Sequence, residues 1–177
     1  TYLSLGTMAI YKDDKLIGTT TKKESEVIQI LNNEAKELIY NIKEENKEIN
    51  IYSNNIKAKI GFNDNLIKVN VTGDGNLYEV NGDINLSKPK EIKKIEKRWN
   101  ETLKKDIIKL LNKTNKEYKS DIFGIGNIIY KENPKRWKKI EKQWNKKYLP
   151  NLNVDVEVNT KIISIGNLTN TLKEGEG

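Results

Sequence analysis

The stretch DIFGIG, from Asp121 to Gly126, places two glycines two positions apart after an aspartate, and closely spaced glycines can cradle a phosphate. A dinucleotide-binding loop needs a third glycine where this chain has Ile129, and a P-loop needs a Gly-Lys-Ser/Thr ending that is absent. We therefore predict a structural role for the motif. Gly124 or Gly126 takes a positive φ or allows close packing, and Asp121 caps a short helix over residues 128–130.

The acidic residues and the missing residue types limit other chemistry. Asp13 and Asp14 fit a hairpin turn, and TGDGN at 72–76 has too few spaced carboxylates for an EF-hand loop. The chain has no histidine and no cysteine, which excludes thiol nucleophiles, disulfides, Ser–His dyads and zinc sites with Cys or His ligands within it. We predict no enzymatic activity, no metal and no cofactor. A hydrolase that uses a carboxylate pair is the hypothesis we rank lowest.

Positive charge is concentrated in two segments. Residues 88–119 hold 12 Lys or Arg and 5 Asp or Glu, whereas residues 131–148 hold 8 and 2, so the net charges are +7 and +6. The whole chain has a net charge of +7, so the remainder carries −6. Such segments can bind nucleic-acid phosphate or anionic lipid, but solvated lysines on an amphipathic helix give the same pattern.

The tryptophans of the second segment favour the structural alternative. Trp137, Ile140 and Trp144 fall at core spacing, so we expect buried aromatic rings and lysines that face water. The basic residues are nevertheless the candidate interaction surface of the chain. They are Lys93, Lys97, Arg98, Lys104, Lys105 and Lys109 in the first segment and Lys135, Lys138, Lys139 and Lys142 in the second.

The hydrophobic pattern predicts the elements of the N-terminal half. Residues 7–21 predict a hairpin, and residues 22–36 predict a short helix with Ser25 as N-cap candidate. Alternation of apolar and polar residues then predicts three half-buried strands. They lie around 49–52, 56–62 and 67–71, with a turn at 62–65 and a turn or bulge at 72–76.

The C-terminal half contains the strongest single signal. Residues 87–119 carry one apolar stripe, which predicts a helix of about 30 residues with Ser87 as N-cap candidate and Pro89 in its first turn. Asn133-Pro134 opens a further helix that Pro150 stops. Val154, Val156 and Val158 alternate with polar residues and predict a final strand.

These elements predict an α+β fold: an antiparallel or mixed β-sheet with one long amphipathic helix and shorter helices packed on it. We expect a single domain over residues 1–167 and a flexible tail at 168–177. No apolar run approaches the roughly 20 residues that span a bilayer. The chain begins with Thr1 instead of Met, and we expect it to be part of a longer protein.

Two stretches resemble a known family. Residues 118–166, YKSDIFGIGNIIYKENPKRWKKIEKQWNKKYLPNLNVDVEVNTKIISIG, closely resemble the C-terminal region of spore germination proteins of the germinant-receptor C-subunit family. The opening GTMAIYKDDKLIGTTTKKES, residues 6–25, resembles the start of the same domain. The resemblance covers residues 1–167 and is only pattern-level across 35–85.

The resemblance implies that the chain is the third, C-terminal domain of a lipoprotein that faces outward from the inner membrane of the bacterial endospore. It implies membrane-embedded A and B subunits as partners, a role in nutrient-triggered germination, no catalytic activity and no small-molecule ligand for this domain. The basic bias suits an anionic membrane surface. We take helix 88–119 as the candidate surface for partner subunits. A nucleic-acid-binding module that uses the basic helices is the alternative, although we do not expect nucleic acid as a partner.

Overall fold

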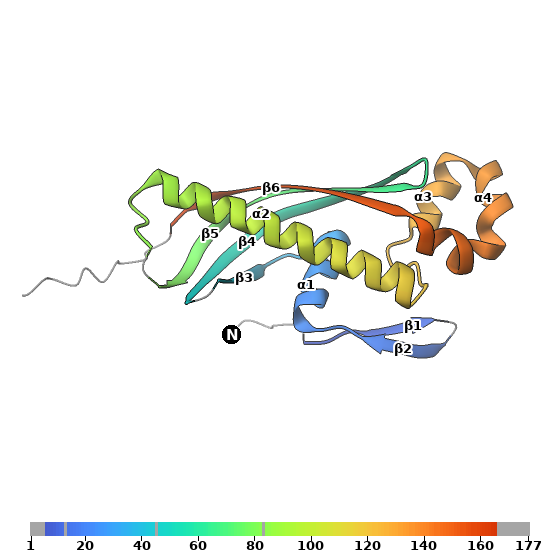
Figure 1. Ribbon diagram of the computed structural model, residues 1–177, viewed down its shortest axis with the longest axis horizontal. Coiled ribbons are helices and arrows are strands. Elements are labelled where there is room, and N and C mark those ends of the chain that lie inside the picture. The colour runs from blue at the N-terminus through green and yellow to red at the C-terminus, as the bar shows by residue number, and fades with distance from the viewer. Residues whose placement is uncertain (1–5, 13, 45, 83, 166–177) are drawn as a thin grey trace, which may run out of the picture.

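The computed structural model describes residues 6–12, 14–44, 46–82 and 84–165 (Figure 1). The strands are β1 (Ala9–Lys12), β2 (Lys15–Thr19), β3 (Leu38–Glu44), β4 (Lys47–Asn63), β5 (Leu66–Asn81) and β6 (Asn153–Ser164). The helices are α1 (Lys22–Leu31), α2 (Pro89–Asn112), α3 (Ile125–Glu132) and α4 (Pro134–Ile140). Shorter helical turns are η1 (Lys113–Glu117), η2 (Glu141–Gln143), η3 (Trp144–Tyr148) and η4 (Leu149–Asn151).

The main sheet has the order β3-β4-β5-β6, and β1 and β2 form a separate hairpin. β4 is antiparallel to both of its neighbours, β3 and β5. β6 runs parallel to β5, because α2 and the helices after it carry the chain back to the same end. The predicted α+β class with a mixed sheet and one long helix is therefore confirmed. At the turn between β4 and β5, Asp64 and Asn65 both take positive φ, as predicted for residues 62–65.

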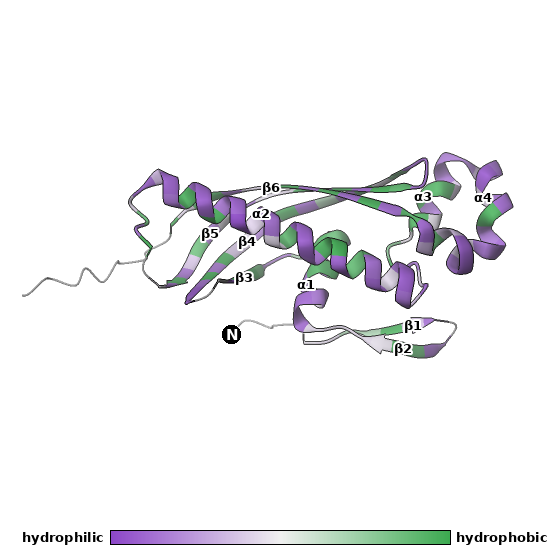
Figure 2. Ribbon diagram, in the orientation of Figure 1, coloured by the Kyte–Doolittle hydropathy of each residue, from purple (hydrophilic) through white to green (hydrophobic). Residues whose placement is uncertain are grey.

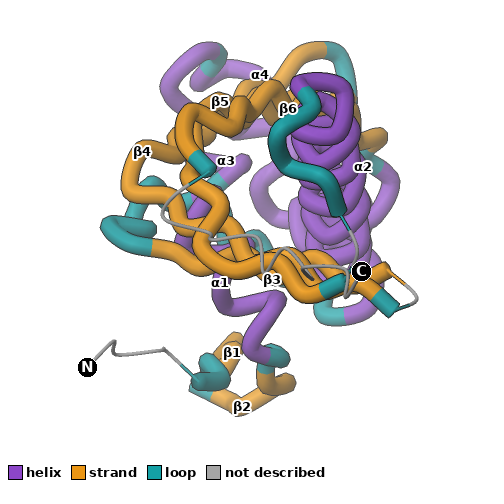
Figure 3. Tube along the Cα trace, turned by 90° about the vertical axis from the view of Figure 1, so that its left-hand side faces the viewer, coloured by secondary structure: helices purple, strands orange, loops and turns teal. Residues whose placement is uncertain are grey.

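The core lies between the concave face of the sheet and α2. Viewed along its length, the sheet curls from β3 through β4 and β5 to β6, and α2 lies in the opening (Figure 3). The stripe on α2 points inward: Ile95, Trp99, Leu103, Ile107 and Leu110 are all buried. α1 covers another part of this face, and its Val27 and Ile30 are fully buried. One face of the sheet is thus apolar and packed, and the other is polar.

Side chains of α2 reach the two edge strands of the sheet. On β3, the Tyr40 hydroxyl donates to the Asp106 carboxylate at 2.5 Å. On β6, Asn100 Oδ1 accepts from the Thr160 backbone N–H at 2.9 Å, and Glu96 accepts from the Ile162 N–H at 2.8 Å. Unpaired edge groups invite intermolecular strand pairing. α2 therefore covers part of the edge at β6 as well as filling the core.

Two N-cap predictions are wrong. Thr21 caps α1, because its hydroxyl accepts from the Glu24 N–H and Glu24 accepts in return from the Thr21 N–H. Ser25 lies inside α1, where it is buried and its hydroxyl is 2.6 Å from that of Thr20. Lys88 precedes α2 without a side-chain cap, and Ser87 hydrogen-bonds to Asn85 instead.

Several predicted boundaries are also corrected. α1 ends at Leu31, and the strand β3 that follows was not predicted. The two strands predicted around 49–52 and 56–62 are one strand, β4, in which the pairing with β5 shifts between Tyr52 and Asn55. Residues 72–76 do not form a turn but continue β5, and the register shift against β6 between Gly75 and Asn76 agrees with the predicted alternative of a bulge.

The predicted helix after Asn133 is broken into segments. α4 ends at Ile140, and η2, η3 and η4 continue the path to Asn151. The Asn133 side chain caps α4 by accepting from the Arg136 N–H, with Pro134 at the first helical position. β1, β2 and β6 lie where hairpin and strand were predicted. The tail expected at 168–177 lies outside the described residues.

Candidate interaction surfaces

The Asp121 carboxylate organises the glycine motif. Its Oδ1 accepts from the Ile125 N–H at 2.8 Å, and its Oδ2 accepts from the Gly126 N–H at 2.7 Å and from Trp144 Nε1 at 2.9 Å. These backbone N–H groups at the start of α3 are the ones that would otherwise attract an anion. An intramolecular carboxylate already occupies them, so Asp121 works as a cap, as predicted, although the helix begins at Ile125 and not at residue 128.

Both glycines have the structural roles expected of them. Gly124 adopts a left-handed conformation with φ +66° immediately before α3. A Cβ on Gly126 would lie 2.5 Å from the ring of Trp137, so only glycine allows this approach. Trp137 in turn packs edge-on against Trp144, with ring centroids 5.4 Å apart. Asp121, Gly126 and the two indoles together fasten α4 to α3.

The six basic residues predicted on α2 lie on or beside its outer side. Lys93, Lys97, Lys104, Lys105 and Lys109 are exposed, and Arg98 is half-buried. Acidic residues are interleaved with them. Lys97 lies 3.9 Å from Glu101, and the neighbouring Lys94 lies 2.7 Å from Glu91. Part of the positive charge of α2 is therefore neutralised on the helix itself.

The four basic residues predicted in the second segment lie on α4 and η2. Lys135, Lys138, Lys139 and Lys142 are all exposed, and spacings of three, four and seven keep them near one side of the helical path. Trp144 is buried and Trp137 is half-buried on the other side. The prediction that the aromatic rings turn inward is confirmed for Trp144 and in part for Trp137. Figure 2 shows α4 mostly in the hydrophilic colour.

The two groups of candidate lysines lie on different elements. α2 begins at the end of the sheet where β5 ends, so Lys93 and Lys97 lie toward that end (Figure 1). The helix then runs back along the sheet toward α3 and α4, and its second half carries Lys104, Lys105 and Lys109. α4 lies at the opposite end, beside the turn between β4 and β5, where the Arg136 guanidinium donates to the Asn65 side chain at 3.1 Å. The candidate surface must therefore be treated as two surfaces: the α2 outer face and the α4 stripe.

Titratable groups between α1, β3 and α2 form a polar cluster that the sequence did not reveal. Lys23 Nζ lies 3.7 Å from the centroid of the Tyr40 ring, donates to the Asn41 carbonyl at 2.8 Å and lies 4.0 Å from Glu26. Burial lowers the pKa of Lys23 and raises the pKa of Glu26. Burial and the hydrogen bond to Asp106 raise the pKa of Tyr40, which keeps this phenol protonated. The cluster joins three elements.

A second polar link joins α1 to the end of the long helix. Lys113 Nζ lies 2.8 Å from Glu24 Oε1, and both side chains are half-buried. Burial works in the opposite direction, but the hydrogen bonds from Lys113 and Thr21 hold the pKa of Glu24 below its ordinary value. The bond to Glu24 raises the pKa of Lys113. This lysine of the first basic segment therefore stabilises the fold and is not part of a free surface.

Sequence reasoning missed the residues by which α2 reaches the sheet edges. Glu96, Asn100 and Asp106 flank its apolar stripe, and their spacing carries no recognised motif. Polar residues at the border of a buried stripe were the available signal, but only the fold shows that each one meets an edge strand.

Two absences concern the described residues alone. None of their helices has an apolar stretch long enough to cross a membrane. No three His, Cys, Asp or Glu side chains in residues 6–12, 14–44, 46–82 and 84–165 lie close enough together to hold a metal ion.

Comparison with known proteins assigns the family. The model of the family described as "Spore germination B3/ GerAC like, C-terminal" matches residues 6–166. The chain belongs to this family, the germinant-receptor C subunits. It is 37% identical over 88 residues to spore germination protein KC of Bacillus subtilis strain 168, an alignment that covers 50% of this chain and 21% of that protein.

A solved structure shares the fold. The crystal structure of the GerBC protein superposes with a TM-score of 0.72 at 18% identity and covers 85% of this chain. The superposed part is 48% of the GerBC chain. The matched parts therefore make up about a fifth of the length of the curated relative and about half of that of the solved one.

Proposed function

We propose that the chain is the non-enzymatic C-terminal domain of a germinant-receptor lipoprotein subunit and acts in nutrient-triggered spore germination through protein–protein contacts. The family match over residues 6–166 supports this proposal. In it, the domain faces outward at the inner membrane of the endospore, held there by a lipid anchor elsewhere in the full-length protein. Its partners are the membrane-embedded A and B subunits.

The α2 outer face is the surface that we assign to the partner subunits. The inner side of α2 is committed to the core and its flanks to β3 and β6, so its position is fixed. Lys93, Lys104, Lys105 and Lys109 project from the other side. Charges on a rigid element steer association and set the register of an interface. We base the assignment to the partner subunits on these exposed lysines, because the helix that carries them is held in place by the core and by both edge strands.

The proposed absence of catalysis rests on how the acidic groups are used. Asp121 bonds to α3 and Trp144, Asp106 bonds to Tyr40, and Glu24 bonds to Lys113. Each carboxylate connects elements of the fold. A general acid or base would instead be free to meet a substrate.

The test is a charge reversal in the full-length protein, expressed in spores. We expect K93E/K104E/K105E/K109E to reduce co-purification of the A and B subunits by at least about tenfold and to slow germination. The control K57E/K59E/K68E/K161E makes the same change in charge on the exposed polar face of the sheet. Unchanged subunit recovery and germination in the α2 variant, at equal protein level, would overturn the assignment.

A further inference from the structure

The lysines of the α4 stripe have no acidic partner among the described residues. Lys135, Lys138, Lys139 and Lys142 are exposed, and in the part of the chain that the structure describes none of them forms an ion pair. No acidic side chain of the described residues therefore offsets their charge. In the first basic segment, by contrast, Lys94, Lys97 and Lys113 have acidic partners. The α2 outer face resembles the α4 stripe in that Lys93, Lys104, Lys105 and Lys109 form no ion pair among the described residues.

The charge around the stripe is unusually dense. Residues 131–148 carry a net charge of +6 within 18 positions, and the only acids among them are Glu132 and Glu141. Lys131, Lys146 and Lys147 are exposed as well. Like charges three or four residues apart on a helix repel one another, and an external anionic surface would relieve this repulsion.

The side chains around the stripe argue against nucleic acid. Proteins that bind single strands offer exposed aromatic rings on which bases stack, but Trp144 is buried and hydrogen-bonded to Asp121. Phosphate groups read one by one favour the planar fork of arginine. The one arginine of this segment, Arg136, already lies over the ring of Phe62 and donates to Asn65. The other basic side chains of this segment are all lysines, which act as point charges and do not form the paired hydrogen bonds of arginine.

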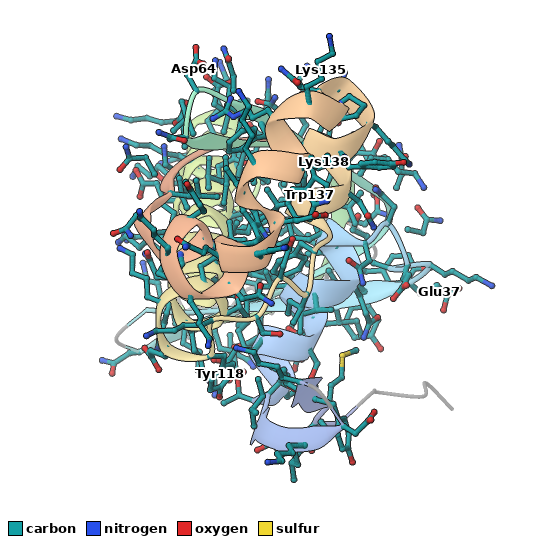
Figure 4. All side chains as sticks on the ribbon, turned by 90° about the vertical axis from the view of Figure 1, so that its right-hand side faces the viewer. Glu37, Asp64, Tyr118, Lys135, Trp137 and Lys138 are labelled. Atoms are coloured by element: carbon teal, nitrogen blue, oxygen red, sulfur yellow. The ribbon has the colours of Figure 1, made fainter. Side chains whose placement is uncertain are left out.

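The position of the stripe suits an extended surface. α4 lies at one end of the elongated molecule, beyond the β4–β5 turn (Figure 1). Figure 4 looks at this end and labels Lys135, Trp137 and Lys138 on α4, with Asp64 of the turn beside them. An approaching flat surface therefore meets the lysines of α4 without displacing α2 or the hairpin.

We propose that the α4 stripe docks the domain on a lipid bilayer that contains anionic headgroups. The contact is electrostatic and lies at headgroup level, because the tryptophans of this segment are used in packing and do not insert. The inference does not depend on the assignment of the α2 outer face to partner subunits, which concerns a different helix.

The experiment measures sedimentation of the whole chain with vesicles of phosphatidylcholine, with and without phosphatidylglycerol. Wild type should bind only the phosphatidylglycerol vesicles, and added salt should weaken binding. A lysine near an anionic surface contributes about a factor of five. K135Q/K138Q/K139Q/K142Q should therefore bind at least about twentyfold more weakly.

Two matched variants separate the stripe from net charge. K57Q/K59Q/K68Q/K161Q removes the same charge from the polar face of the sheet and should weaken binding less than about threefold. K135R/K138R/K139R/K142R keeps the charge and should bind like wild type. Equal losses in the two glutamine variants, or equal binding of wild type to both kinds of vesicle, would overturn the proposal.

A second arm tests the competing partner. Labelled duplex and single-stranded DNA should show no shift at physiological ionic strength and micromolar protein. DNA binding that is tighter than vesicle binding and is lost in K135Q/K138Q/K139Q/K142Q would reassign the stripe to nucleic acid and contradict the lipid proposal. The α2 assignment would stand in either case, because it is read from subunit recovery in spores.

Discussion

The first basic segment, residues 88–119, and the second, residues 131–148, have nearly equal net charges of +7 and +6, but the fold uses them differently. The long helix fills the curled sheet, bonds to both edge strands and pairs two of its lysines, Lys94 and Lys97, with acids. The segment that contains α4 lies at one end, packs through one side only and leaves its lysines unpaired within the described chain. Net charge alone therefore does not identify a binding surface. Whether a lysine can bind a partner depends on whether an acidic side chain already pairs with it and on how the opposite face of its helix is packed.

The largest expected effect tests the claim that α2 holds the core. Trp99→Ala should lower the free energy of unfolding by about 3–5 kcal/mol, because Trp99 is fully buried. Urea unfolding measures this. Lys105→Ala on the outer side of the same helix should change stability by less than about 0.5 kcal/mol. A loss at Trp99 no larger than that at Lys105 would contradict the described packing.

Asp121→Ala probes how the α4 segment is attached. It leaves the N–H groups of Ile125, Gly126 and Trp144 without their acceptor, which should cost about 2–3 kcal/mol. Hydrogen exchange should quicken mainly over residues 125–151 and spare the sheet. Asp155→Ala, at an exposed position on β6, is the control. Uniformly faster exchange would show that the segment is not a separate cooperative unit.

Gly126→Ala tests the same attachment by steric conflict. The new Cβ would lie 2.5 Å from the Trp137 ring, so we expect a loss of about 1–3 kcal/mol in the free energy of unfolding. Gly61→Ala is the matched control, because no atom lies within 4 Å of its Cβ position. If both variants melt at the wild-type temperature, the contact between α3 and Trp137 is looser than described.

The smallest effect distinguishes a paired lysine from a free one. Glu24→Gln removes the acidic partner of Lys113 and should cost about 0.5–1 kcal/mol at neutral pH. The folded-state pKa of Glu24 is depressed, so this contribution is present above its ordinary value of 4.5 and is lost as the pH falls through the folded pKa. Unfolding curves of both proteins should converge in acid. Lys142→Gln should leave the free energy of unfolding unchanged. A larger loss of stability in Lys142→Gln than in Glu24→Gln would contradict the distinction between paired and unpaired lysines.

The sequence predicts elements with strong local signals and misses those that depend on distant partners. The stripe of α2, the alternation of β6 and the cap at Asp121 are all local, and the fold confirms them. β4 was read as two strands because its buried positions change phase, from Ile49 and Ile51 to Ile56. The register shift with β5 produces that change, and Ser53 donates to the Asp74 carbonyl at 2.6 Å beside it.

The candidate surfaces were predictable only in part. Composition and helical spacing were enough to single out the lysines of both segments and to predict that Trp144 is buried. That Lys113 is paired with Glu24, 89 positions away in the chain, follows only from the fold. That α2 begins at the end of the sheet opposite α4 follows from the parallel pairing of β5 with β6, which no local pattern encodes.

A photoreactive crosslinker placed in turn at Lys104 and at Lys139 of the full-length protein in spores compares the two surfaces directly. Both positions are exposed, so neither replacement should disturb the fold. We predict that position 104 crosslinks to a membrane-embedded receptor subunit and that position 139 crosslinks to lipid. Lipid adducts at 104 with protein adducts at 139, or the same adducts at both positions, would contradict the division of roles.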